Sequence, residues 1–63
     1  MIRVYVITKK VNLGGQEITM YYNLAEEDWL YFSATFFTKS QALVIIEEKA
    51  LGDVDVNYVE IWG

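Results

Sequence analysis

A single helix is marked at both of its ends in a sequence that otherwise alternates between apolar and polar residues. Thr38 and Gln41 have the spacing of a capping box, in which the side chain of each residue bonds the backbone of the other. Gly52 is the residue type that most often adopts the left-handed conformation after the last turn of a helix. The sequence therefore predicts a helix over residues 38–51.

One side of this helix is apolar. At the helical spacing, the small or branched apolar residues fall within one wide stripe, and Phe37 can pack against the first turn as a hydrophobic staple. The stripe comprises Ala42, Leu43, Ile45, Ile46 and Ala50. Val44 is the exception, because it projects from the polar side. We expect the stripe to lie on a β-sheet.

The remaining segments have the alternation of strands. Gly14 and Gly15 lie between the first two segments and supply the positive φ angles of a tight hairpin turn. Residues 24–28 form either one helical turn capped by Asn23 or an acidic loop. The expected strands are residues 2–11, 16–23, 29–37 and 54–62. The fold class is thus α+β, a single domain over residues 1–63 with a mainly antiparallel sheet in the order β-β-β-α-β.

The last expected strand has apolar residues in both phases. Val54, Val56 and Tyr58 fit one face, whereas Val59 and Ile61 fit the other. Either a β-bulge switches the phase, or the strand is central in the sheet and covered on both faces.

The composition excludes several chemistries. The 63 residues include neither cysteine nor histidine. Disulfides, zinc, haem and iron–sulfur sites are therefore excluded, as are nucleophilic triads that need histidine. A glycine-rich phosphate loop is also missing. We expect neither a catalytic activity nor a cofactor.

Acidic residues outnumber basic residues by nine to five, so the net charge is −4. This charge opposes binding to a phosphate backbone. The acidic residues outside the expected core are Glu26, Glu27, Asp28, Glu47, Glu48, Asp53 and Asp55. They keep the chain soluble, or they imitate a row of phosphates and occupy the basic channel of a nucleic-acid enzyme. A third possibility is a carboxylate-based metal-binding or catalytic site centred on residues 26–28.

One helix can cover one face of the sheet, and the other face is expected to be unusually aromatic. If Ile2, Val4 and Val6 face the helix, together with the matching residues of the second and third strands, the opposite face carries a different set. That set comprises Tyr5, Ile7, Tyr21, Trp29 and Tyr31. A sheet face in water is normally polar, so we expect a contact surface here. It would bind a second copy of the chain, another protein, or single-stranded nucleic acid by base stacking, although the net charge disfavours the last.

The chain shows no membrane or secretion signal. The first residues lack a basic segment followed by an apolar one, and no apolar run approaches the roughly 20 residues that span a bilayer. The lack of cysteine fits a reducing compartment. We expect a cytoplasmic protein without a membrane partner.

Residues 29–42 combine an aromatic strand, a Thr cap and a helix with an early alanine. The residues concerned are Trp29, Ala34, Thr35, Phe36, Phe37, Thr38 and Ala42. This arrangement resembles small bacteriophage and prophage proteins that consist of a short sheet and one helix. Some phage proteins of this size bind and inhibit host enzymes or defence systems. The resemblance implies a non-enzymatic accessory or inhibitor protein that acts on a host protein in the bacterial cytosol.

Overall fold

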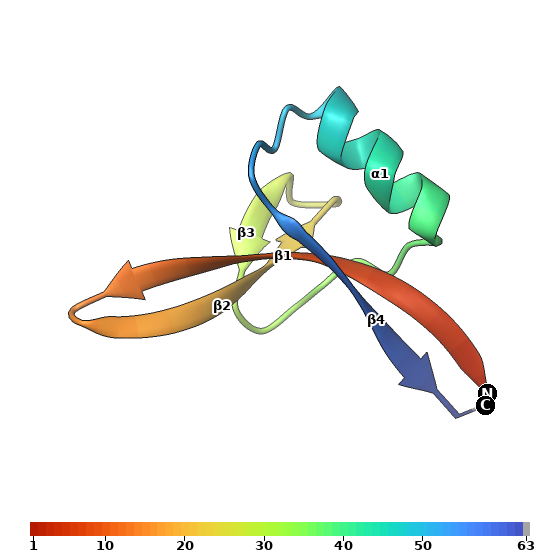
Figure 1. Ribbon diagram of the computed structural model, residues 1–63, viewed down its shortest axis with the longest axis horizontal. Helices are drawn as coiled ribbons and strands as arrows, with labels where there is room; N and C mark the ends of the chain where they lie inside the picture. The colour runs from red at the N-terminus through yellow and green to blue at the C-terminus, as the bar shows by residue number, and fades with distance from the viewer. Residues whose placement is uncertain (63) are drawn as a thin grey trace.

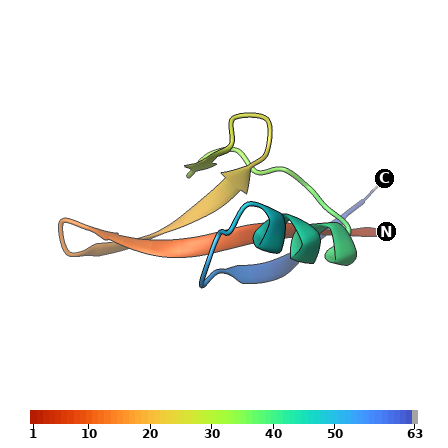
Figure 2. The same ribbon diagram turned by 90° about the horizontal axis from the view of Figure 1, so that it is seen from above.

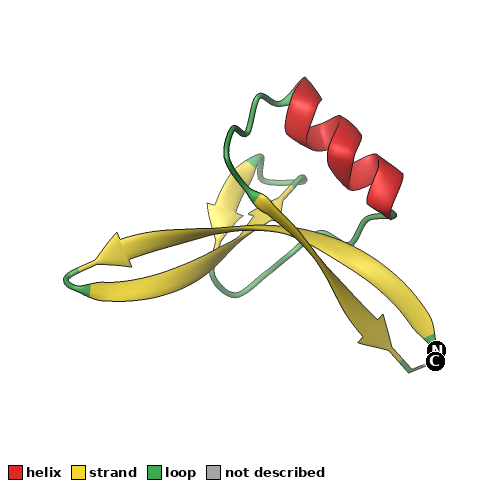
Figure 3. Ribbon diagram, viewed as in Figure 1, coloured by secondary structure: helices red, strands yellow, loops and turns green. Residues whose placement is uncertain are grey.

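The computed structural model describes residues 1–62, which form an antiparallel four-stranded sheet and one helix (Figures 1 and 3). The elements along the chain are β1 (Ile2–Leu13), β2 (Gln16–Asn23), β3 (Asp28–Leu30), α1 (Lys39–Glu48) and β4 (Asp55–Ile61). The strand order is β3-β2-β1-β4, and every neighbouring pair is antiparallel. The predicted α+β class is confirmed.

The predicted β1–β2 hairpin is confirmed. Gly14 and Gly15 have φ angles of 58° and 85°, as a two-residue turn between right-twisted strands requires. The side-chain Oδ1 of Asn12 accepts a hydrogen bond of 3.1 Å from the backbone N–H of Gly15. The tip of this hairpin projects away from the helix (Figures 1 and 2).

The third predicted strand, residues 29–37, is wrong over most of its length. β3 ends at Leu30 because the chain then crosses back towards β1. On the way, the backbone N–H of Thr35 donates to the carbonyl of Tyr22 at 3.2 Å, and the Thr35 hydroxyl accepts from the N–H of Leu24 at 2.8 Å. Phe37 then exchanges two backbone hydrogen bonds of 2.8 Å with Tyr5. The β1–β2 pairing ends at Thr8↔Tyr21, and Phe37 therefore pairs with β1 on the same side, beyond the end of β2.

The helix begins as predicted and ends earlier. The Thr38 hydroxyl accepts from the N–H of Gln41 at 3.2 Å, and the Gln41 side chain accepts from the N–H of Thr38 at 3.0 Å. At the other end, Ala50 has a φ of 52°. Its N–H donates to Glu47, and the N–H of Leu51 donates to Ile46, which completes a Schellman motif. Ala50, and not Gly52, is thus the left-handed residue that ends the helix.

Neither explanation offered for the mixed phase of the last strand holds. β4 pairs with β1 without interruption from Ile2↔Ile61 to Thr8↔Asp55, so its register contains no bulge, and it lies at an edge of the sheet. The helix contacts only the beginning of the strand, where Val56 packs against the core. Val59 pairs with Val4 on the face of the sheet opposite to Val56 and the core.

The core of the described residues is small and centres on Ile7, which is completely buried. Tyr22, Phe37 and Ala42 form the buried cluster with it. The partly buried residues around this cluster are Leu24, Trp29, Ile45, Ile46, Leu51, Val54 and Val56. The predicted phase of the first strand is therefore wrong, because the odd-numbered Ile7 faces the helix and Val6 lies on the opposite face. Part of the predicted helix stripe is also wrong, since Leu43 and Ala50 are exposed and Ala50 lies beyond the end of α1.

Candidate functional site

The predicted aromatic outer face is not assembled as one surface. Cross-strand partners place their side chains on the same face, so Tyr5, Ile7 and Trp29 share the helix side with Tyr58, Val56 and Tyr22 respectively. Tyr21 pairs with Thr8 and lies on the opposite face. Tyr31 follows β3 and is exposed, with its ring 5.2 Å from that of Phe32.

This error has a physical cause in β1. Val6 and Ile7 are adjacent, branched and apolar, so alternation alone does not decide which of them faces the helix. The structure buries both, with 3% and 0% exposure. The Tyr5–Phe37 bridge places Phe37 beside β1, and Ile7 joins Phe37 in the core.

Two aromatic rings on the helix side of the sheet each have a cation lying over them. The Arg3 guanidinium is 4.3 Å from the ring centre of Tyr58, and the Lys9 ammonium is 4.5 Å from that of Trp29. Arg3 also lies 3.9 Å from a carboxylate oxygen of Glu60. Both aromatic rings are therefore engaged within the chain.

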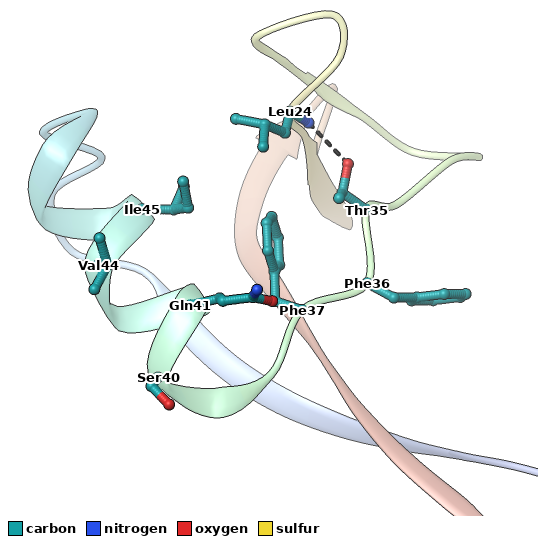
Figure 4. A pocket seen from close by; sticks show the side chains of 8 residues that line it. All are labelled: Leu24, Thr35, Phe36, Phe37, Ser40, Gln41, Val44 and Ile45. Atoms are coloured by element: carbon teal, nitrogen blue, oxygen red, sulfur yellow. Dashed lines mark hydrogen bonds between the residues drawn. The ribbon is translucent and has the colours of Figure 1, made fainter.

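An apolar groove lies between α1 and the segment that precedes it. Its volume is about 450 Å³. The lining residues are Leu24, Thr35, Phe36, Phe37, Ser40, Gln41, Val44 and Ile45. Figure 4 shows Leu24, Phe37 and Ile45 directed into the space between the helix and residues 35–37. The groove is therefore an open concavity lined by side chains from three separate segments.

The polar groups of the groove are largely engaged within the protein. The Thr35 hydroxyl bonds the backbone of Leu24, and the Gln41 side chain caps the helix. Val44 is 55% exposed at the rim. A surface of this kind offers apolar contact and few free hydrogen-bonding groups.

The sequence does not predict the groove, although one residue signals it. Val44 is the apolar residue on the polar side of the helix. Phe36 was predicted to face the helix, and it is exposed at the far rim instead. Neither residue identifies the groove alone, because the path of residues 31–37 decides what lies opposite the helix.

The acidic turn reaches the end of the helix. A carboxylate oxygen of Glu27 lies 2.8 Å from the ammonium group of Lys49. The hydrogen bond and the charge of Lys49 lower the pKa of Glu27, and the same contact raises the pKa of Lys49. Glu48 adds to the raised pKa of Lys49, so this acid also lies near the cation.

The other predicted acidic residues are spread along the chain. Glu26 lies in the same turn, and its backbone N–H donates to Asn23 Oδ1 at 3.0 Å. Asp28 begins β3, Glu47 lies in the last turn of α1, and Asp53 precedes β4, which begins at Asp55. Within residues 1–62, no three carboxylates come together in a group that could hold a metal ion. The geometry therefore gives the metal-site hypothesis no support.

In the part of the chain that the structure describes, no helix has the length and apolar character needed to cross a membrane. Comparison of the chain with protein-family models, with curated proteins and with solved structures gives no match. The groove and the exposed surface are therefore the features from which a function can be inferred.

Proposed function

We propose that the protein is a non-enzymatic interaction module whose groove between α1 and residues 35–37 binds apolar side chains of another protein. The observation that carries the proposal is the groove itself, which has a volume of about 450 Å³ and in which the Thr35 hydroxyl and the Gln41 side-chain oxygen already accept hydrogen bonds within the chain. Protein partners present apolar and aromatic anchors to pockets of this character.

The surface around the groove supports a protein partner. Phe36 and Val44 line the groove and are both 55% exposed. Large apolar side chains that gather on a surface are typical of the centre of protein interfaces. Because the chain resembles small phage proteins, we propose a bacterial host protein as the partner. The proposed activity is inhibition of that host protein.

Val44→Glu is the variant that tests the groove, because it places a charge at the apolar rim. Leu43→Glu is the matched control. Leu43 directly precedes Val44 on the same helix, is similarly exposed and does not line the groove. The purified wild-type protein serves as bait in a bacterial lysate, and the affinity of the captured protein is then measured by calorimetry. We expect Val44→Glu to weaken binding at least tenfold and Leu43→Glu to leave it unchanged.

Two outcomes would contradict this proposal. If both variants bind the captured protein as tightly as the wild type does, the groove is not the site. If neutralising Glu26 and Asp28 abolishes binding while Val44→Glu does not, the acidic surface is the binding site. Far-UV circular dichroism of each variant verifies that the fold is retained.

A further inference from the structure

The outer edge of β4 is an open edge of the sheet. In the strand order β3-β2-β1-β4, β4 has β1 on one side, and among residues 1–62 no strand lies on its other side. Figure 1 shows it diverging from the helix towards the chain termini. An open edge carries backbone donors and acceptors that a further strand can bond.

The pairing of β1 fixes which groups of β4 point outward. The N–H of Tyr5 donates to the carbonyl of Phe37, and the carbonyl of Tyr5 accepts from the N–H of Phe37, both at 2.8 Å. Both bonds lie on the side of β1 away from β4. The pair Tyr5↔Tyr58 is therefore one of the pairs of this ladder that are not hydrogen-bonded. It follows by alternation that the backbone groups of Tyr58, Val56 and Glu60 point away from β1.

β4 carries two acidic residues, Asp55 and Glu60, but it lacks the lysine, proline and bulge that most often protect an edge strand. The seven residues Asp55–Ile61 contain neither lysine nor proline, and their pairing with β1 is uninterrupted. Tyr58 and Val59 are exposed on the two faces of the strand. Natural edges are commonly blocked by lysine, proline or a bulge, so this edge is open to pairing.

Side-chain complementarity selects a second copy of the same strand in one register. An antiparallel pair with Val59 opposite Val59 of the other copy joins two apolar residues on one face. On the other face, Glu60 comes opposite Tyr58 of the other copy, over whose ring Arg3 lies at 4.3 Å. Arg3 then lies between carboxylates of both copies. A register shifted to centre on Tyr58 would place the charged Asp55 opposite Ile61, whereas the register centred on Val59 places the uncharged Asn57 there.

We propose that two copies of the chain associate through β4 in an antiparallel pair centred on Val59, which makes one continuous eight-stranded sheet. The backbone groups of Tyr58 and Glu60 then bond each other across the two-fold axis. This surface is separate from the groove, so Val44→Glu leaves the pairing intact and the two proposals fail independently.

Single cysteines test the register, because the natural sequence contains none. In a pair that is not hydrogen-bonded, opposite Cα atoms lie about 4.5 Å apart, which a disulfide can bridge. Val59→Cys should therefore form a covalent dimer under mild oxidation at least tenfold faster than Asp55→Cys on the same face. In the proposed register the two Asp55 positions lie about 27 Å apart, at about 3.4 Å per residue.

Equal rates for these two variants would overturn the proposal, as would faster linkage of Tyr58→Cys than of Val59→Cys. Light scattering on the wild type should show a concentration-dependent dimer, and a strict monomer across a hundredfold concentration range would also overturn it. Glu60→Pro removes an outward N–H while sparing the bonds to β1. It should shift the wild-type dimer to monomer more than Glu60→Ala does, and equal effects would count against backbone pairing.

Discussion

At the scale of single residues, Ala50 has an unusual backbone, since only it and Glu27 have a positive φ among the non-glycine residues of 1–62. Its φ of 52° lies in the left-handed region, where glycine is the common residue after a helix. The conformation is imposed by the Schellman bonds from Ala50 to Glu47 and from Leu51 to Ile46, at 3.2 and 3.0 Å. A β-carbon in this conformation costs about 1 to 2 kcal/mol. The chain tolerates the cost because Leu51 and Ile46 both pack against the core.

Replacing Ala50 with glycine should stabilise the protein. The gain is the relief of the left-handed strain, less the greater backbone entropy that glycine loses on folding, and should be about 0.5 to 1 kcal/mol. Ala50→Val should do the opposite, because a branched β-carbon crowds this conformation further. Urea unfolding of the three proteins measures the order. An unchanged midpoint in both variants would show that the helix end is not held in this conformation in solution.

At the scale of elements, the Glu27–Lys49 ion pair joins the β2–β3 turn to the end of α1. The lowered pKa of Glu27 means that its carboxylate stabilises the folded state above the usual glutamate range, and that this contribution is lost as the pH falls through the lowered value. The raised pKa of Lys49 means that its contribution is lost as the pH rises through the raised value. Both side chains are solvent-exposed, so the effect on stability is small.

The titration of Glu27 itself is therefore the sharper measurement. Carbon-detected NMR should find the pKa of Glu27 below the usual glutamate range, because Lys49 donates a hydrogen bond to its carboxylate. In Lys49→Gln the pKa of Glu27 should rise to the usual range. A pKa that does not respond to this substitution would show that the turn and the helix end do not meet in solution.

The elements differ in how far the sequence predicts them. The start of α1 depends on Thr38 and Gln41, which are three residues apart, and the hairpin turn depends on two adjacent glycines, so local chemistry predicts both. The phase of β1 is different, because Val6 and Ile7 are equally suited to either face. The length of β3 is decided by bonds from Thr35 and Phe37 to distant strands, which no local pattern contains.

At the scale of the whole molecule, the candidate surfaces follow from how few residues the fold buries. One short helix covers one end of a strongly twisted sheet whose hairpin and β4 extend beyond it (Figures 1 and 2). The groove needs the path of residues 35–37, and the open edge needs the strand order. Both are long-range features, so the sequence predicts an apolar contact surface but not its location.

The small core makes the whole fold dependent on Ile7. Truncating a buried isoleucine to alanine costs about 2 to 5 kcal/mol. A domain of this size has a total stability of about 3 to 9 kcal/mol, so Ile7→Ala should remove a large share of that stability. Ile2→Ala is the matched control in the same strand, because Ile2 is 58% exposed. Urea unfolding should show a large shift for Ile7→Ala and almost none for Ile2→Ala.

Protein concentration adds a second readout to this comparison. If pairing through β4 selects the folded chain, mass action should raise the folded fraction of Ile7→Ala as its concentration increases. Combining Ile7→Ala with Glu60→Pro should abolish this dependence, because the proline blocks the edge and leaves the core untouched. Equal losses of stability in Ile7→Ala and Ile2→Ala would place the core elsewhere. If the folded fraction of Ile7→Ala does not change with concentration, assembly through β4 does not stabilise the fold.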